Sequence, residues 1–525
     1  MTTVPPATRP DPESRNARPR RGRRVGRLLL AWIALFYVFT AGGSLTTTDA
    51  LVTYELTRQM VDHGSIALPG NMLGSEAHRG VDGRYYSPFG IAQSVVNVPF
   101  YLAAVAIERL GVRIGPSDSL RKAAIAMGNT LVMATTIWVV YLFGWMLADS
   151  VRAGLATALL AGLATPLWPY SKFGFNAPLS ALFVTAAVFS AWRTTQGRPR
   201  SAMVTGIWIG LALLTRHELV LVAVPILAFF WMSVRTRSEF LQHAAMLVTG
   251  LLPALVGWLS YNAWRFGHPL DAGYMRDPVP GFGSSPLEGL YGLLLSPSAS
   301  LIAYCPVALA GGLGLVTLWK RDRALAGLLG GSIGVLLLFY SQLGNWMGGR
   351  SYGPRYLVPA LPLLCVGLAP LVAQRRRLGW LAVLAVVSVI VQLPGVLVDY
   401  AKVSVANARA EGAPSRAERL VNWQTSALFL NTRAAARLLP ANVALLIGGS
   451  PPPALATAQS TARGEFSQQF AQSLDFWWMY LFHMRTLSAA AVGGIVLMVV
   501  TTLTGLLVAL RRALHAYDMG ELRDS

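Results

Sequence analysis

Long apolar runs separated by short polar or basic stretches fill most of the chain. Because an α-helix rises 1.5 Å per residue, about 20 apolar residues cross the hydrocarbon core of a bilayer. The pattern therefore predicts an all-α polytopic membrane protein with about twelve transmembrane helices. The twelve runs lie at residues 28–45, 123–147, 151–168, 175–192, 201–214, 218–234, 242–263, 299–319, 324–343, 356–373, 379–397 and 487–510.

A thirteenth apolar run, at residues 89–108, decides on which side of the membrane each loop lies. Lys and Arg in short loops stay on the cytoplasmic side. If residues 89–108 do not cross, the clusters of Arg and Lys between the later runs all fall inside. We therefore expect an interfacial helix in the first extracytoplasmic loop, with both termini cytoplasmic. A re-entrant hairpin would give the same charge pattern.

The topology divides the chain into four parts. Residues 1–26 are expected to form a disordered basic cytoplasmic tail, although the n-region of a secretory signal has a similar composition. Residues 27–397 form the transmembrane core, whose first outer loop is 46–122. Residues 398–485 form an extracytoplasmic cap, and residues 486–525 contain the last transmembrane helix and a cytoplasmic tail.

Composition agrees with a membrane protein and excludes a soluble enzyme. Hydrophobic residues make up 54% of the chain and charged residues 13%, against about 25% charged residues in soluble domains. The net charge of +20 comes from short clusters between apolar runs, so it indicates membrane topology and gives no case for nucleic acid. Both cysteines, Cys305 and Cys365, lie inside apolar runs, which excludes a disulfide framework and a thiolate metal site.

Asp49 is the first candidate for chemistry. It follows the first run directly, in the sequence Thr46 to Asp49, and an apolar helical pattern comes after it. An ionisable group at the edge of a membrane is costly and is therefore a functional candidate. Asp49 can serve as a general base, or a Thr or Asp side chain here can simply cap the following helix.

Two further clusters carry cations. Arg216, His217 and Glu218 occupy a tight outer turn, and His217 with Glu218 begins a zinc-like motif that fails because position 221 is Leu. The stretch from Gly348 to Tyr356 holds Arg350, Tyr352 and Arg355, and its glycines let the backbone approach a ligand whose phosphate the arginines would bind. Ordinary alternatives are a snorkelling arginine and an interfacial belt of Arg and Tyr.

Aromatic rings and cations recur at other outer helix ends. Arg84, Tyr85 and Tyr86 lie in the first outer loop, and Lys172 ends the sequence from Trp168 in an outer turn. Ring faces suit a sugar and cations suit a phosphate. Together they predict contacts to a sugar that is attached to a lipid phosphate.

These stretches resemble the GT-C class of integral-membrane glycosyltransferases, which use polyprenyl-phosphate sugars as donors. The similarity is strongest to the protein O-mannosyltransferase and aminoarabinose transferase branches in bacteria, and it covers about residues 27 to 400. It is carried by Thr48–Asp49 with the helix to Gly64, by Gly83 to Gly90, by Leu214 to Glu218, by Tyr291 to Pro297 and by Ser351 to Leu357.

The resemblance implies an inverting transfer of a hexose or pentose from the lipid carrier to an acceptor hydroxyl. Asp49 would deprotonate the acceptor, and Arg350, Arg355 or Arg216 would bind the donor phosphate. Arg84, Tyr85, Tyr86, Lys172, His217, Glu218 and Tyr352 would contact the sugar or lipid. The site would face outward from the cytoplasmic (inner) membrane, and the acceptor would be a glycan, a lipid or a protein.

Some features depart from that class or favour other functions. Several relatives carry two adjacent acids after the first span, whereas Ala50 follows Asp49 here. No cofactor is therefore required, and dependence on a divalent metal stays uncertain. A membrane transporter or lipid flippase is the alternative function, although the sequence has no inverted repeat and few mid-span charges. An inactive relative that scaffolds envelope assembly is a third possibility.

Overall fold

The computed structural model describes residues 12–70, 77–114, 118–273, 281–374, 378–448 and 472–524. Within these ranges the chain is almost entirely helical. The one sheet there pairs β1 (His78–Arg79) with β2 (Tyr85–Tyr86), antiparallel, with His78 opposite Tyr86. The all-α class expected from the apolar runs is confirmed.

Each of the twelve apolar runs coincides with helical structure. The corresponding elements are α1 (Pro12–Phe39), α4 (Ser119–Ala148), α5 (Val151–Leu163), α7 (Ala177–Thr195), α8 (Ser201–Thr215), η2 (His217–Val222) with α9 (Ala223–Ser233), α10 (Arg237–Phe266), α12 (Leu301–Tyr304) with α13 (Val307–Trp319), α14 (Arg323–Ser341), η4 (Arg355–Ala360) with α15 (Leu361–Val366) and α16 (Ala369–Val372), α17 (Leu378–Leu397) and α23 (Ala489–Asp524).

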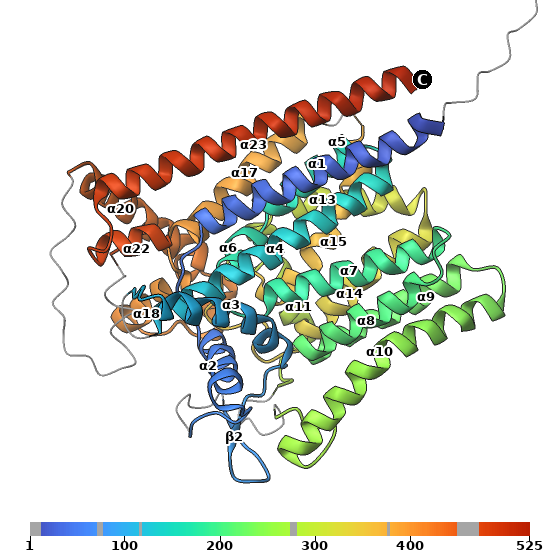
Figure 1. Cartoon of the computed structure of the whole chain (residues 1–525). Helices are drawn as coiled ribbons and strands as arrows, with labels where there is room; N and C mark the ends of the chain where they lie inside the picture. The colour runs from blue at the N-terminus through green and yellow to red at the C-terminus, as the bar shows by residue number, and fades with distance from the viewer. Residues whose placement is uncertain are drawn as a thin grey trace, which may run out of the picture.

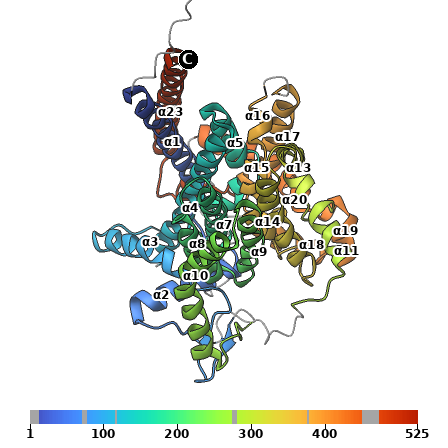
Figure 2. The ribbon, with the colours of Figure 1, turned by 90° about the vertical axis from the view of Figure 1, so that its right-hand side faces the viewer.

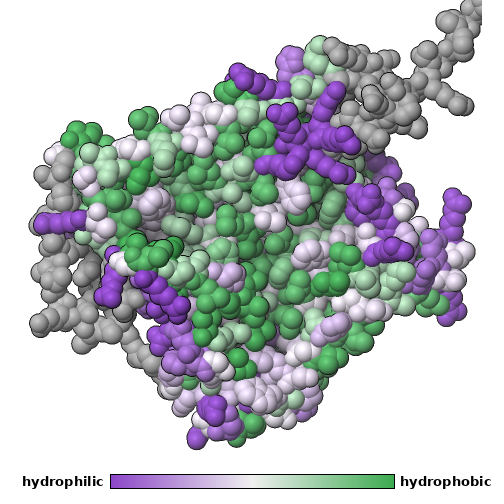
Figure 3. Space-filling view, in the orientation of Figure 1, coloured by the Kyte–Doolittle hydropathy of each residue, from purple (hydrophilic) through white to green (hydrophobic). Residues whose placement is uncertain are grey.

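Length and composition identify which helices can cross a membrane unaided. Six helical stretches in the described ranges qualify, and four shorter apolar ones have 10–17 residues. Figure 3 shows apolar side chains over the long helices, with hydrophilic side chains gathered toward the ends of the bundle. A band of this kind is what a bilayer requires, so the chain is a membrane protein. The six stretches are Ser119–Ala148, Arg237–Phe266, Arg323–Ser341, Arg355–Val372, Gly379–Leu397 and Ala489–Met519.

The first helix differs from its prediction at both ends. It begins at Pro12, so residues 12–26 are helical where a disordered tail was expected, while residues 1–11 lie outside the described residues. Proline suits the first turn of a helix and arginine is a good helix former, so the basic stretch extends the span. The helix ends at Phe39, short of residue 45, and Gly43 in the segment that follows adopts a positive φ of 70°.

The long helices run roughly side by side (Figure 1). α1 packs against α4 and α23, α4 against α5 and α7, and α7 against α8. Pro12 of α1 and Asp524 of α23 lie at the same end of the bundle, and the α7–α8 and α9–α10 connections lie at that end as well (Figure 1). The termini and these two arginine-bearing loops therefore share one side, as the charge pattern requires.

Two glycines let α8 and α10 approach closely. A Cβ at Gly206 would lie 1.9 Å from the Leu247 carbonyl oxygen, and one at Gly250 would lie 2.1 Å from the Met203 carbonyl oxygen. Helices in lipid associate mainly by close packing, which small residues permit. The sequence therefore fixes this contact through residues that carry no side chain.

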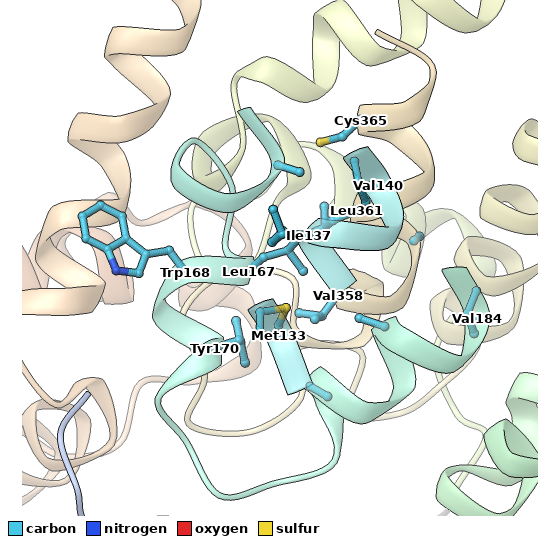
Figure 4. Close-up of a cluster of buried hydrophobic side chains, with 14 of the residues drawn as sticks. Met133, Ile137, Val140, Leu167, Trp168, Tyr170, Val184, Val358, Leu361 and Cys365 are labelled. Atoms are coloured by element: carbon cyan, nitrogen blue, oxygen red, sulfur yellow. The ribbon is translucent and has the colours of Figure 1, made fainter. Parts of the chain in front are cut away.

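The middle of the bundle is a core of buried apolar side chains from α4, α7, α15 and the short helix α6 (Leu167–Ser171). Figure 4 shows Met133 and Ile137 of α4 beside Leu167 of α6 and Leu361 of α15. These elements come from distant parts of the chain, so the core ties the turn at Leu167–Ser171 to the 355–372 stretch.

The first outer loop holds α2 (Thr48–His63) and α3 (Ala92–Arg109). α3 extends sideways from the bundle in Figure 2, across the direction of the long helices. Its buried side includes Gln93, Ser94 and Asn97, whereas Val95 and Leu102 are about half exposed. An apolar exposed side on a crosswise helix is the arrangement expected of an interfacial helix. Residues 92–109 form one continuous helix, so this stretch is not a re-entrant hairpin.

Polar contacts hold α3 against α2 and α4. The Arg121 guanidinium lies 2.8 Å from the Glu108 carboxylate, and it also donates to the Tyr101 hydroxyl at 2.7 Å. That hydroxyl donates to Asp62 at 2.6 Å. α3 is thus fixed at its end by a network that joins three helices.

The remaining elements belong to the two later outer stretches. The region expected as a cap, 398–485, contains several helices, and its residues 449–471 lie outside the described residues. α20 packs against α17 and α18, which joins this region to the core. These elements are α11 (Pro286–Leu294), α18 (Tyr400–Glu411), α19 (Arg416–Val421), η6 (Trp423–Thr425), α20 (Ala427–Ile447) and α22 (Trp477–His483).

Candidate active site

Asp49 lies in the first turn of α2 and does not cap that helix. The N-cap is Thr47, whose side chain accepts from the Ala50 amide at 3.4 Å. The Asp49 carboxylate instead forms an ion pair with Arg355, which lies 306 residues further along the chain. The two side chains are 23% and 16% exposed, so the pair is partly buried.

The loop before η4 places Arg355. Gly348 and Gly349 adopt φ values of 73° and 75°, which a residue with a Cβ rarely adopts. The resulting turn points the Gly348 carbonyl at the Arg355 guanidinium, which donates to it at 3.2 Å. The guanidinium carbon also lies 4.6 Å from the ring centroid of Phe175. These glycines therefore serve the turn that holds the arginine.

Arg216 lies over the ring of Tyr356, the residue that follows Arg355. Its guanidinium is 3.0 Å from the Glu218 carboxylate, which also accepts from the Tyr340 hydroxyl at 2.8 Å. The guanidinium carbon lies 5.2 Å and 5.0 Å from the ring centroids of Tyr340 and Tyr356, and these two rings stack on each other. Because Tyr356 directly follows Arg355, the two cations share one stretch of the site.

Two phenylalanines form the floor beneath Arg355. The rings of Phe173 and Phe175 are 6.1 Å apart, and the Tyr400 ring packs 4.3 Å from Phe173. The buried Asn129 side chain donates to the carbonyl oxygens of Phe173 at 2.6 Å and Phe175 at 3.0 Å. One amide in α4 therefore sets the position of the floor.

Replacing Asn129 with alanine is expected to destabilise the protein. The change leaves two buried carbonyl oxygens without their donor, and each such group costs about 1–3 kcal/mol. Thermal unfolding in detergent measures the effect. Thr135→Ala is the matched control on the same helix, because its exposed hydroxyl bonds only the Leu131 carbonyl. Equal unfolding temperatures for the two variants would contradict the assignment.

Other residues expected at the site lie elsewhere. Arg350 is exposed, and its charge acts on Arg419 of α19. His217 accepts a hydrogen bond at 2.8 Å from the Trp258 indole. Tyr352 is fully buried, with its hydroxyl bonded to the Val391 carbonyl oxygen. The structure pairs Asp49 with Arg355 and Arg216 with Glu218, whereas Arg350, His217 and Tyr352 make the other contacts just given.

The first-loop residues form a separate small structure. Tyr86 is 1% exposed, donates from its hydroxyl to Asp82 at 2.7 Å and packs against Trp264. Arg84 is exposed and lies 3.6 Å from Asp82, while Tyr85 is half-buried in β2. Tyr86 therefore holds the hairpin against α10, and contacts of Arg84 and Tyr85 with a sugar stay a prediction.

Lys172 is buried in an ion cluster of its own. It is 2% exposed and lies 2.7 Å from the Asp475 carboxylate, which accepts from the Tyr480 hydroxyl. Lys402 bonds the same hydroxyl at 3.1 Å and lies 3.5 Å from Asp399. We call these five residues the Lys172 cluster. It joins the turn before α7 to the 398–485 region.

Burial and charge act against each other in the Lys172 cluster. Burial raises the pKa of the Asp399 carboxyl and lowers the pKa of the Lys172 ammonium. For Asp475, burial is outweighed by Lys172, Lys402 and Tyr480, so its pKa is held below the ordinary value. Asp475 is therefore ionised at neutral pH and depends on its cations.

Sequence reasoning missed Glu218's partner Tyr340, the phenylalanine floor and Tyr400. Each lies in an apolar or helical stretch with no motif around it. Asp399 and Tyr400 directly follow the apolar run 379–397, as Asp49 follows the first apolar run. That signal was available in the sequence, whereas the contacts of Phe173 and Phe175 were not.

Among the described residues, no group of three or more His, Cys, Asp or Glu side chains could hold a metal ion. Around Asp49 the cations are arginines, which supply positive charge without a metal. Whether the protein depends on a divalent metal stays a prediction.

Comparisons with known proteins agree with the resemblance read from the motifs. Residues 103–264 match the model of the dolichyl-phosphate-mannose-protein mannosyltransferase family. This segment includes Arg216 and Lys172 and excludes Asp49 and Arg355. No curated protein matches the sequence.

Similar solved structures come from two kinds of enzyme. ArnT from Cupriavidus metallidurans bound to undecaprenyl phosphate is 16% identical, with a TM-score of 0.47, over 95% of this chain and 77% of that chain. The archaeal oligosaccharyltransferase AglB from Archaeoglobus fulgidus, in complex with an inhibitory peptide and a dolichol-phosphate, is 12% identical, with a TM-score of 0.42, over 88% and 60% of the two chains. The family match confirms the resemblance to GT-C glycosyltransferases that use polyprenyl-phosphate sugars. It covers about a third of this chain.

Proposed function

We propose that this protein is a glycosyltransferase that moves a sugar from a polyprenyl-phosphate carrier to an acceptor hydroxyl. The single observation that supports it most is the pairing of Asp49 with Arg355, with Arg216 over the ring of the following residue, Tyr356. A carboxylate that can take a proton and two cations that can bind a phosphate are thereby gathered from three distant parts of the chain.

The proposed reaction face is the outer side of the cytoplasmic membrane. Asp49 lies in the first turn of α2, which packs against α3, and the α7–α8 and α9–α10 connections lie at the opposite end of the bundle (Figure 1). Because arginine clusters in short loops stay in the cytoplasm, the end of the bundle that holds Asp49 faces outward. Both termini are then cytoplasmic.

The proposed step is an inverting displacement. Asp49 takes the proton of the acceptor hydroxyl, the acceptor oxygen bonds the anomeric carbon, and the bond from that carbon to the phosphate oxygen breaks. The leaving lipid phosphate gains negative charge, which the guanidinium groups of Arg355 and Arg216 stabilise. The leaving group needs no acid.

The ion pair has a consequence for this mechanism. In an inverting displacement the attacking and leaving oxygens lie on opposite sides of the anomeric carbon, so the base and the phosphate-binding cation cannot stay in contact. Donor binding must therefore separate Asp49 from Arg355. The phosphate replaces the carboxylate as the partner of Arg355, which frees Asp49 as a base only when the donor is present.

Binding of undecaprenyl phosphate tests the proposed phosphate site. Arg355→Ala is expected to weaken binding roughly 10- to 100-fold, the effect of one lost hydrogen bond to a charged group. Arg350→Ala is the matched control from the same loop and is expected to change binding less than about twofold, because its side chain is exposed and away from the pair. Affinity is measured on purified protein in lipid nanodiscs.

The two possible failures have different meanings. Equal affinity of the wild type and Arg355→Ala would remove Arg355 from the phosphate site. The second failure is a wild type that neither binds the lipid nor consumes a polyprenyl-phosphate sugar. If that protein moves such a lipid across the membrane of reconstituted vesicles without an acceptor, the flippase alternative would replace the glycosyltransferase proposal.

A further inference from the structure

Two hydrogen-bond donors beside the Asp49–Arg355 pair have no partner among the described residues. They are the hydroxyl of Tyr400 and the Nε of Arg355, and both atoms are buried. Tyr400 as a whole is 2% exposed. A buried donor without a partner costs about 1–3 kcal/mol, and native structures keep few of them.

Both donors are held over the same surface. The Tyr400 ring lies 4.3 Å from Phe173, the Arg355 guanidinium carbon lies 4.6 Å from Phe175, and the two phenylalanine rings adjoin. Tyr352 also packs 6.2 Å from the Tyr400 ring. Packing therefore fixes both side chains before any ligand arrives.

Tyr400 remains a donor at neutral pH. Burial raises the pKa of its hydroxyl well above the ordinary value, although the charge of Arg355 acts in the opposite direction. The hydroxyl keeps its proton and can give a hydrogen bond without becoming an anion.

The ligand that satisfies a buried O–H and a buried guanidinium N–H together is an oxyanion. A phosphate oxygen accepts from both, and it gains the strength of a charge-assisted hydrogen bond. A neutral sugar hydroxyl would leave the positive charge of Arg355 unbalanced once Asp49 has moved away. The pairing of these donors therefore favours a phosphate over a sugar.

We propose that the Tyr400 hydroxyl donates a hydrogen bond to the phosphate of the lipid-linked sugar, together with Arg355. The inference rests on the proposed function and adds a residue to it. Tyr400 begins α18, in the region that sequence analysis treated as a cap, so this region contributes to the donor site. As the bond to the anomeric carbon breaks, the added charge on the phosphate strengthens this hydrogen bond.

The test compares Tyr400→Phe with Tyr54→Phe. Tyr54 is the matched control, because its hydroxyl is also buried without a partner among the described residues and its ring lies against Tyr101 and Lys122 instead. Undecaprenyl phosphate is the probe, in nanodiscs. Tyr400→Phe is expected to raise its Kd about 10- to 100-fold, and Tyr54→Phe to leave it within about twofold.

Thermal unfolding without ligand provides a second readout. Because Tyr400→Phe removes an unpartnered hydroxyl and keeps the ring, it is expected to unfold at or above the wild-type temperature. A loss of several degrees would mean that the hydroxyl has a structural partner, which would overturn the proposal. Inorganic phosphate as competitor distinguishes the headgroup from the lipid chain. Displacement of undecaprenyl phosphate by inorganic phosphate from the wild type, and weaker displacement from Tyr400→Phe, supports the assignment.

The outcomes separate the two levels of inference. Equal affinity of the wild type and Tyr400→Phe for undecaprenyl phosphate would overturn the role of Tyr400 and leave the proposed function intact. A wild type that does not bind this lipid at all would count against the proposed function itself.

Discussion

Replacing Asp49 with asparagine is expected to abolish sugar transfer without abolishing donor binding. Asparagine keeps the shape of the side chain and removes the ability to take a proton. General-base assistance typically contributes about 10²- to 10⁴-fold, so turnover should fall by at least that factor. Mass spectrometry of polyprenyl-phosphate sugars, before and after incubation with purified protein and envelope extract, measures the loss.

The ion pair with Arg355 adds a second expectation for the same variant. In the wild type the carboxylate competes with the donor phosphate for the guanidinium. Without that carboxylate, Asp49→Asn should bind undecaprenyl phosphate as tightly as the wild type or more tightly. A fall in kcat with unchanged or improved binding is the pattern of a group that acts only in the transition state.

Glu55→Gln is the matched control for this experiment. Glu55 is the next acid in α2, but it accepts from Gln59 at 2.9 Å and lies 3.5 Å from Arg58. The Glu55→Gln variant is therefore expected to retain wild-type turnover. Donor consumption by Asp49→Asn at the wild-type rate would place the base elsewhere, and loss of turnover in both variants would point to a general requirement for acids on α2.

Replacing Lys172 with methionine is expected to give the largest loss of stability. The change leaves the ionised Asp475 carboxylate without its nearest cation, and the Asp475 side chain is only 2% exposed. Breaking a buried ion pair from one side costs about 3–5 kcal/mol, because the remaining charge is uncompensated. Thermal unfolding of the detergent-solubilised protein measures it, and Lys172→Met/Asp475→Asn should recover part of the loss.

Arg416→Ala is the control for Lys172→Met. Arg416 also pairs with a carboxylate, Glu288, at 2.6 Å, but these side chains are 40% and 31% exposed. Such pairs contribute about 0–1 kcal/mol. If Lys172→Met is as stable as Arg416→Ala and binds undecaprenyl phosphate poorly, then Lys172 contacts the ligand and is not a structural cation.

Helices were the easiest part of the structure to predict, because the reason for them is local. A backbone in lipid must satisfy its own hydrogen bonds, so each long apolar run becomes helical whatever surrounds it. The same logic failed at residues 12–26 and 40–45. There the first helix begins within the basic stretch, whose residues favour a helix, and it ends at Phe39, before the apolar run does.

Candidate chemistry was harder to predict, because exposure and direction are not local properties. Arg350 and Arg355 are five residues apart in one glycine-rich loop, yet Arg355 reaches Asp49 and Arg350 faces solvent. Lys172 and Tyr352 had suitable chemistry at an outer helix end, but the fold buries both. A cation near a helix end can bind a ligand or balance a buried carboxylate, and sequence alone does not distinguish these uses.

By itself, the sequence determined that this chain is a helical membrane protein, where its helices lie, and that Asp49 and a set of arginines stand at helix ends. Apolar length and charge clustering suffice for this, because the bilayer acts on each segment separately. Only the tertiary structure decided that Asp49 meets Arg355, that Lys172 meets Asp475, and that Tyr400 lies over the same phenylalanine floor as Arg355. These contacts join residues hundreds of positions apart, and they exist only because the helices between them pack in one arrangement.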